Sequence, residues 1–276
     1  MTKYLTALMI VSTVAPVAQA NTIDTYVTIQ SADRSVDTNA AGIVGSTPVF
    51  ASDSDSSTTD LRFTTSATVY EYVALSRTEA VAMRSVVNHN GNLTEDTFGA
   101  ELYTVSASYA VGAGNTGSTQ SDNLYDVEFD LSQRVRFTST YNFRTIQQGA
   151  GANAFSSIEL TDGAGTVIND LVNAAAYASA ASDSGWLEAG TANLTVEQVA
   201  DANSLGGSIG ANTSGSFLVR LYCPADIDMD GDVDTTDQSI FNAYYSNGDV
   251  AGDMDGDGDI DAADLNAYGI SFASGC

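Results

Sequence analysis

The feature that most constrains this chain is a twelve-residue acidic loop that occurs twice near its C-terminal end. The first copy covers residues 226–237 and the second covers residues 253–264, an offset of 27 residues. Each copy has aspartate at positions 1, 3, 5, 7, 9 and 12 and glycine at position 6. This spacing is the pattern of a calcium-binding loop. A disordered acidic tail, which is the alternative, has no reason to repeat it in register.

The two loops predict two calcium sites built from aspartate oxygens. Carboxylates are expected to coordinate at positions 1, 3, 5 and 12, a backbone carbonyl at position 7, and position 9 directly or through water. Gly231 and Gly258 permit the sharp turn at position 6 because they lack a Cβ. Repulsion among the carboxylates must oppose folding until a cation binds, so we expect folding to require two calcium ions. The predicted ligands are Asp226, Asp228, Asp230, Asp232, Asp234, Asp237, Asp253, Asp255, Asp257, Asp259, Asp261 and Asp264.

A short helix is expected after each loop. Phe241 and Tyr245 stand four residues apart, and the same offset between the loops maps them onto Tyr268 and Phe272. Aromatic pairs at this spacing form an apolar stripe on one helix face. The two stripes can pack on each other, but so small a core is marginal alone. Metal ions and a disulfide would have to supply the remaining stability.

The N-terminal residues 1–20 have the pattern of a secretory signal, with Lys3 before an apolar run and Ala18-Gln19-Ala20 at the cleavage point. A membrane anchor is the alternative, although the apolar run is short for a span. Export favours oxidised cysteines, so we predict a disulfide between Cys223 and Cys276, which bracket the acidic repeat. Two free thiols or an intermolecular bridge remain the alternatives. The mature chain is expected to be extracellular.

The charge of the chain narrows its classes of partner. The formal net charge is −26, and the stretch from Cys223 to Cys276 holds 13 aspartates without any Lys, Arg or Glu, so it carries half of that excess. Nucleic acid and anionic membrane surfaces repel such a chain, and we expect neither as a partner. No segment after residue 20 is apolar enough to span a bilayer, so membrane insertion of the mature chain is not expected.

The duplicated loop, followed each time by one helix and lacking an entering helix, resembles a dockerin. Dockerins are calcium-dependent modules that dock onto cohesin receptors in extracellular assemblies. The opening Cys223-Pro224-Ala225-Asp226 and the terminal Gly275-Cys276 resemble the GC-type variety found in exported proteins. The resemblance covers about a fifth of the chain. It implies a cohesin-like protein receptor as the partner.

The resemblance also implies a docking face beside the first loop. In dockerins, loop positions 10 and 11 help to choose the receptor. Here those positions differ between the two copies, which argues against a symmetric dual binding mode. Aspartate also replaces the asparagine that cellulosomal dockerins often have at positions 3 and 9. The residues expected to contact the partner are Thr235, Thr236, Asn242, Ala243 and Asn247.

The body, residues 21–222, has the pattern of short strands separated by turns. Val135, Phe137, Tyr141 and Phe143 alternate with polar residues, which is typical of a half-buried strand. This pattern predicts an antiparallel β-sandwich or jelly roll. Similar alternations occur in 127–131, 158–160, 192–196 and 217–221, with Gly- and Ser-rich gaps at 111–118, 149–153, 162–165 and 205–215. Residues 76–88 are ambiguous, and 174–182 could be a helix or a strand. The segment 185–196 resembles a strand-turn-strand of exported bacterial β-sandwiches.

The body shows little recognisable chemistry. Its lone histidine, His89, stands in a turn-like setting that is more typical of a surface residue than of a catalytic one. Asp53, Asp55 and Asp60 could form a further calcium site, but a solvated loop is favoured. Trp186 and the tyrosines could stack on sugars, although packing is the commoner role of aromatic residues. Acids available for glycosidic cleavage include Glu71, Glu79, Glu101, Glu128, Glu159 and Glu188.

The sequence therefore predicts three parts: a signal peptide at 1–20, a mainly β body at 21–222 and a small helical calcium module at 223–276. The expected function is display on an extracellular scaffold or cell surface through the dockerin. The body would be a structural or carbohydrate-binding module, which leaves a polysaccharide open as a second ligand. A polysaccharide hydrolase with its catalytic residues in the body is the alternative. Because almost no linker separates the two parts, they should move little relative to each other.

Overall fold

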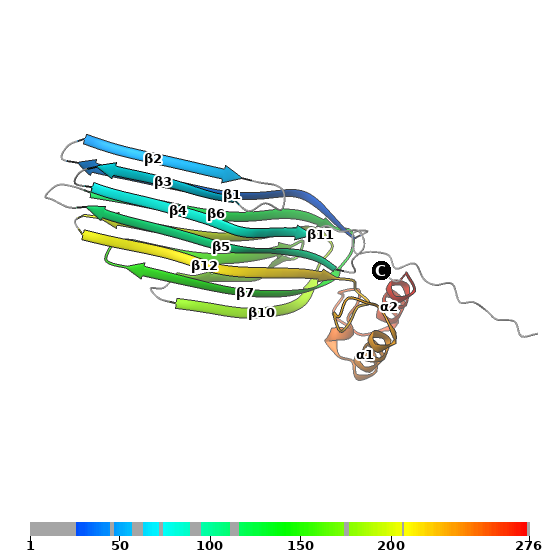
Figure 1. Cartoon of the computed structure of the whole chain (residues 1–276). Coiled ribbons are helices and arrows are strands. Elements are labelled where there is room, and N and C mark those ends of the chain that lie inside the picture. Colours follow the sequence, from blue (N-terminus) through cyan, green and yellow to red (C-terminus); the bar gives the residue numbers. More distant parts are fainter. Residues whose placement is uncertain are drawn as a thin grey trace, which may run out of the picture.

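The computed structural model describes residues 26–44, 47–56, 63–71, 74–88, 95–110, 116–173, 177–205 and 207–274. These residues form a long two-layered body and a small helical module at one end of it (Figure 1). Neither helix has the length and apolar character needed to cross a membrane. The predicted signal segment, His89, Asp60 and Cys276 lie outside the described residues.

The body consists of two six-stranded antiparallel sheets that pack face to face (Figure 1). The first sheet has the order β2-β1-β6-β11-β8-β9, and the second has the order β10-β7-β12-β5-β4-β3. The strands of the first sheet are β1 (Val27–Val44), β2 (Thr47–Ser56), β6 (Thr116–Leu131), β8 (Ala152–Asp162), β9 (Gly165–Val172) and β11 (Gly190–Ser204). Those of the second are β3 (Phe63–Glu71), β4 (Ala74–Asn88), β5 (Glu95–Ala110), β7 (Val135–Gln148), β10 (Tyr177–Leu187) and β12 (Gly207–Tyr222). The predicted antiparallel sandwich is confirmed.

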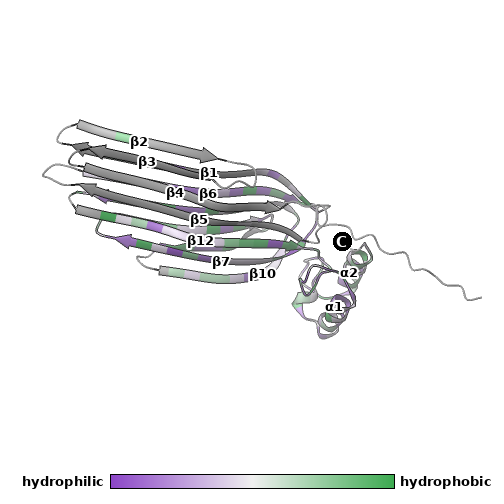
Figure 2. Ribbon diagram, viewed as in Figure 1, coloured by the Kyte–Doolittle hydropathy of each residue, from purple (hydrophilic) through white to green (hydrophobic). Residues whose placement is uncertain are grey.

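Alternating side chains explain why the two sheets face each other. Along β6 and β7, inward residues are buried while most of their neighbours are half-buried or exposed, and Figure 2 shows hydrophobic and hydrophilic residues alternating along β7. Among the described side chains, inward residues of both sheets form one large cluster, in which Tyr125 of β6 meets Phe217 of β12 edge-on at 4.8 Å. The alternation predicted from Val135 to Phe143 is therefore confirmed.

The structure corrects the prediction of a loop at 205–215. Strand β12 begins at Gly207 and pairs along its length with β5, and from Gly210 onward also with β7. Two neighbouring ladders satisfy its backbone groups, so this Gly- and Ser-rich segment needs no apolar side chains to be a strand. At Gly215 a Cβ would clash with the backbone carbonyl of Asn142, which explains why glycine stands in this strand interior.

Three other segments are also strands. Residues 76–88, which were ambiguous, lie within β4, and the part of 174–182 from Tyr177 onward lies within β10. Asp53 and Asp55, expected in a solvated loop, lie in β2, whose backbone pairs with β1. Pairing with β1 fixes this backbone extended, so the predicted loop is wrong for these two residues.

The helical module follows directly on β12. It contains α1 (Thr235–Asn247), a short 3₁₀ turn η2 (Val250–Gly252) and α2 (Ala262–Ser274). The predicted helix after each loop is confirmed. Asp234 caps α1 by accepting from the backbone N–H of Thr236, and Gly248 ends the helix with φ of 64°. The two aromatic stripes meet as expected, because Phe241 stacks on Tyr268 with ring centroids 4.0 Å apart.

One acidic side chain of the body has a perturbed environment. Asp122 lies on the outward face of β6, where one carboxylate oxygen accepts from Gln120 at 3.0 Å and the other is buried without a partner among the described residues. Burial chiefly, and the charges of Asp201 and Glu197, raise its pKa from 3.8 to about 6. A raised carboxyl pKa stabilises the folded state at low pH, and this contribution is lost as pH rises through about 6.

Replacing Asp122 with Asn should therefore stabilise the folded chain most at alkaline pH, where Asp122 is ionised. The variant keeps a neutral side chain of similar shape, so its free energy of unfolding relative to the parent should rise by about 1 kcal/mol between pH 4 and pH 8, after discounting for partial exposure. Urea unfolding at both pH values, at constant calcium, measures this difference. Glu128→Gln, on the same strand and exposed, is the matched control. Equal pH dependence of both variants would contradict the explanation.

Candidate metal centre

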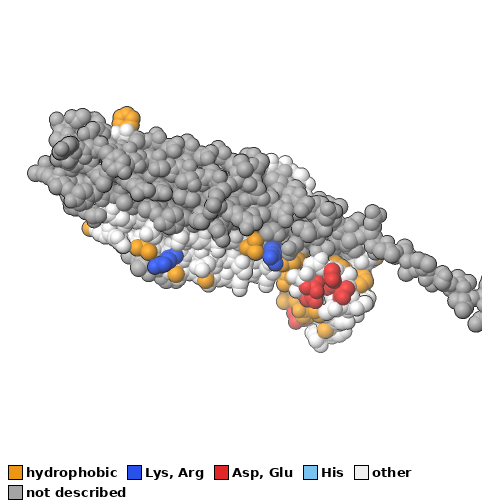
Figure 3. All heavy atoms as spheres, viewed as in Figure 1, with side chains coloured by type: hydrophobic (Ala, Val, Ile, Leu, Met, Phe, Trp, Pro, Cys, Tyr) orange, Lys and Arg blue, Asp and Glu red, His pale blue; other side chains and the backbone are white. Residues whose placement is uncertain are grey.

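The two acidic loops bring their aspartates together as the sequence predicts. Four groups of three carboxylates have one oxygen of each member within 4.8 Å of the others, and each loop supplies two groups that share its position 12. Aspartate side chains gather on the exposed face of the module (Figure 3). The groups are Asp226, Asp228 and Asp237; Asp232, Asp234 and Asp237; Asp253, Asp255 and Asp264; and Asp259, Asp261 and Asp264.

Position 12 organises the first loop through backbone hydrogen bonds. One oxygen of Asp237 accepts from the backbone N–H of Ile227 at 2.6 Å and of Asp228 at 3.2 Å. Its other oxygen accepts from the backbone N–H of Asp234 at 2.9 Å. This single buried carboxylate therefore joins the first residues of the loop to the start of α1.

The second loop repeats this arrangement. Asp264 accepts from the backbone N–H of Met254 at 2.6 Å, Asp255 at 3.4 Å and Asp261 at 2.8 Å. The same three loop positions thus donate to the same carboxylate in both copies. Two stretches of different sequence fold alike, because the spacing of aspartate and glycine fixes the local backbone.

Position 1 is buried in both loops and closes the turn. The Asp226 carboxylate accepts from the backbone N–H of Gly231 at 3.1 Å, and the Asp253 carboxylate accepts from the backbone N–H of Gly258 at 3.2 Å. Both glycines have the left-handed φ that the sequence predicts for position 6, 99° and 92°. The loop therefore wraps around a carboxylate that faces inward.

The electrostatics of the first loop disfavour ionisation of its buried aspartate. Burial, and then repulsion from Asp237, raise the pKa of Asp226 from 3.8 to about 7. One oxygen of Asp226 is buried without a hydrogen-bond partner among the described residues. The pKa of Asp232 is also raised, chiefly by the charge of Asp230. A divalent cation would relieve this repulsion and give the buried oxygen a partner, and an all-oxygen donor set suits a hard cation.

Two details differ from the predicted ligand set. Asp230 and Asp257, at position 5, fall outside the four groups, and each accepts from the backbone N–H two residues on at 3.1 Å. At position 7, expected to offer only its carbonyl, the carboxylates of Asp232 and Asp259 lie with those of positions 9 and 12. The short side chains at position 5 bond locally to the backbone, a preference that the spacing of the loop alone does not reveal.

All of the residues predicted to contact a partner are exposed. They lie at the start and along the outer side of α1, away from the buried Phe241. These residues are Thr235, Thr236, Asn242, Ala243 and Asn247. Cys223 is buried and disulfide-bonded. Its predicted pairing with Cys276 stays a prediction, because Cys276 is outside the described residues.

Sequence reasoning missed the residues of the body that contact the module. Arg134 and Arg136 are among the polar residues that alternate with Val135, Phe137, Tyr141 and Phe143, and nothing in that pattern points to the module. For Trp186 the sequence predicts packing but not the partner. In the structure both guanidinium groups lie over the Trp186 ring, at 4.5 and 4.1 Å from its centroid. Trp186 packs against the apolar cluster of the module, so the role expected of it, packing, is confirmed.

Comparisons with known proteins add little to this geometry. No known protein family matches the chain, and no curated protein matches it. Among solved structures, TmCBM61 in complex with beta-1,4-galactotriose is 12% identical, with a TM-score of 0.22, over 41% of this chain and 80% of that one. The infectious bursal disease virus VP2 subviral particle is 10% identical, with a TM-score of 0.28, over 71% of this chain and 57% of that one. The enzymatically active domain of bacteriophage CBA120 tailspike protein 4 is 11% identical, with a TM-score of 0.18, over 44% of this chain and 19% of that one. These TM-scores are too low to support an inference about function.

Proposed function

We propose that residues 223–276 are a dockerin-like calcium module that attaches the exported β-sandwich to an extracellular scaffold or cell surface. The observation that carries the proposal is the repeated scaffold of the two loops. In each, a buried position 12 carboxylate accepts from three equivalent backbone N–H groups. Each loop leads into a helix, and the helices join through the stacked rings of Phe241 and Tyr268.

Calcium is the cation that this donor set fits best. The grouped ligands are carboxylates, without histidine or cysteine, and calcium prefers six to eight such oxygens in a flexible cage. Each loop carries six aspartates and would hold one ion. The module has no basic residue to offset them, so the energy of metal binding would become folding energy.

The attachment face is assigned to α1. Its exposed residues beside the first loop are small and polar, which suits a protein receptor of the cohesin kind. The body would then be the displayed part, as a structural or carbohydrate-binding module. Export and a Cys223–Cys276 disulfide complete the proposal, since both suit a small calcium module outside the cell.

Retention on the native cell-surface or scaffold fraction tests the proposal. The full chain should be retained in calcium, while Asp226→Ala combined with Asp253→Ala should lower retention at least tenfold by disabling both cages. Thr236→Arg, which places a bulky charge on the exposed face of α1, should do the same without loss of calcium. Thr140→Arg, on the exposed face of β7, is the matched control and should be retained. Equal retention of all four proteins would show that the module is a stabilising cap rather than an anchor.

A further inference from the structure

Two aromatic residues of the body complete the apolar core of the module. Trp186, near the end of β10, packs against the module cluster of Cys223, Ala225, Ile227, Phe241, Met254 and Tyr268. Tyr26, just before β1, packs against both this cluster and the core of the sandwich. The module core is thus continuous with the body through side chains that the body supplies.

Arg134, just before β7, connects the body to the second loop. Its Nη1 donates to the backbone carbonyl of Asp253 at 2.6 Å and lies 3.7 Å from the Asp253 carboxylate. Its Nε pairs with Glu188 of the body at 2.8 Å. A Cβ built on Gly256, at position 4 of the loop, would lie only 3.4 Å from the guanidinium group. The second loop therefore packs against the guanidinium group of Arg134 at Asp253, its first predicted calcium ligand.

Arg136 makes the corresponding contact with the first residues of the module. Its Nε donates to the backbone carbonyl of Pro224 at 3.2 Å, and its Nη2 donates to the backbone carbonyl of Ala251 at 3.3 Å. Pro224 precedes the first loop and Ala251 precedes the second, so one buried side chain contacts the segments that lead into the two loops. The ring of Trp186 lies under this guanidinium and that of Arg134. Such contacts are strong when they are desolvated.

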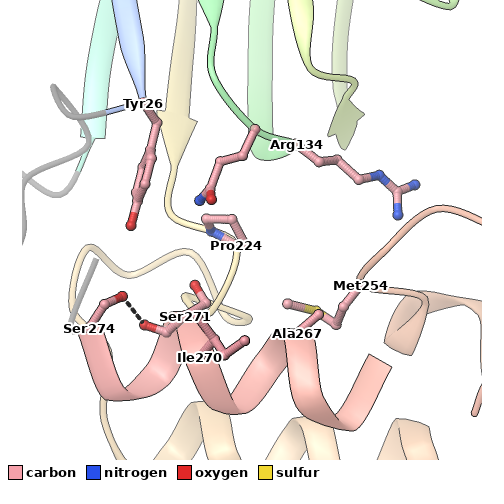
Figure 4. Close-up of a pocket in the computed structure, with 9 residues that line it drawn as sticks. Tyr26, Arg134, Pro224, Met254, Ala267, Ile270, Ser271 and Ser274 are labelled. Atoms are coloured by element: carbon pink, nitrogen blue, oxygen red, sulfur yellow. Dashed lines mark hydrogen bonds between the residues drawn. The ribbon is translucent and has the colours of Figure 1, made fainter. Parts of the chain in front are cut away.

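The junction also contains an open space. A cavity of about 210 Å³ lies between the strand ends and α2. In Figure 4, Tyr26 projects from the body toward α2, whose Ile270 and Ser271 line the opposite wall, while Arg134 extends toward the loop that carries Met254. The close polar contacts described above, from Arg134 and Arg136, therefore lie beside this cavity.

We propose that calcium in the module is energetically coupled to the stability of the sandwich, with Arg134, Arg136 and Trp186 as the coupling residues. The proposal rests on calcium binding by the two loops. Ordering of the second loop by its ion fixes the carbonyl and carboxylate that Arg134 contacts, and this holds the ends of β7 and β10. By linkage, calcium that favours the folded module also favours the junction contacts, and it raises the stability of the sandwich by the part of its binding energy that these contacts transmit.

The test uses the full secreted chain with three readouts. Calorimetry counts the calcium ions, thermal unfolding followed by the sheet signal gives the midpoint of the body, and Trp186, the only tryptophan of the chain, reports on the junction by fluorescence. Raising free calcium to about a hundred times Kd should raise the sheet midpoint by roughly 5 °C or more. The emission of Trp186 should change over the same calcium range.

Arg134→Met combined with Arg136→Met should separate binding from coupling. This variant should still bind two ions, but the calcium-dependent rise of its sheet midpoint should fall to less than half. Arg134→Met alone gives the same test if the double variant does not fold, because this side chain lies at the rim and is 17% exposed. The matched control is Arg144→Met, exposed on the same strand about 30 Å away, which should keep the full rise.

The outcomes separate this proposal from the one on which it rests. Two ions that bind the parent chain without moving its sheet midpoint would overturn the coupling and leave the calcium sites standing. A full calcium-dependent rise of the sheet midpoint in the double arginine variant would overturn the coupling as well. A parent chain that binds no calcium would overturn both proposals.

Discussion

Removing calcium is expected to abolish the helical signal of this protein while the sandwich stays folded at room temperature. Within the described residues the α-helices are α1 and α2, both in the module, so helical circular dichroism reports on the module alone. Six aspartates per loop repel one another, and the raised pKa of Asp226 shows that its ionisation in the folded loop is already unfavourable. Without the cation, the small core around Phe241 cannot offset this repulsion.

Circular dichroism during titration with a calcium chelator measures this effect. The helical signal should fall cooperatively and return when calcium is restored, whereas magnesium at the same concentration should restore little of it, because magnesium demands a tighter octahedral site. Asp226→Asn with Asp253→Asn should reproduce the loss at moderate calcium. A helical signal that is unchanged in chelator would mean that the disulfide and the body hold the module by themselves.

Replacing Phe241 with Ala is the second change with a large expected effect. This ring is fully buried and stacks on Tyr268 with an interplanar angle of 4°, and the ring of Tyr245 lies tilted beside it with the centroids 6.0 Å apart. Truncation of a buried phenylalanine costs about 3–5 kcal/mol. A two-helix module has little stability to spare, so we expect it to be unfolded at calcium concentrations that saturate the parent chain, with the apparent calcium affinity lowered at least a hundredfold.

The control for Phe241→Ala is Ile270→Ala on α2, whose side chain is 63% exposed. It should change the stability of the module by less than about 0.5 kcal/mol, because surface truncations remove few contacts. Calcium titrations followed by helical circular dichroism compare the two variants directly. Similar calcium affinities for both would mean that the stacked rings do not form the core of the module.

The sequence predicts the module better than the body because the module is built from local contacts. Loop ligands, position 6 glycines and aromatic pairs all lie within a few residues of one another. Even the stack of Phe241 on Tyr268 follows from the repeat, since each ring has the same place in its own copy. The two loops and both helices can therefore be predicted from the spacing of residues along the chain alone.

The body is harder to predict because its pairings are distant in sequence. Alternation identifies β7, but nothing local shows that β12, with its Gly- and Ser-rich first half, lies between β5 and β7. The junction is more distant still, since the bond from Arg134 to Asp253 joins residues 119 positions apart. Arginines that alternate along a strand are expected to face solvent, and only the placement of the module at that end of the sheet gives them partners.

Calcium stoichiometry tests the central claim most directly. Native mass spectrometry of the oxidised, secreted chain should show two calcium ions per molecule, falling to one in Asp226→Ala and to one in Asp253→Ala. The double variant should carry none. A parent chain without bound calcium at millimolar concentrations, or a double variant that still carries two ions, would contradict the assignment of the paired loops as the calcium sites.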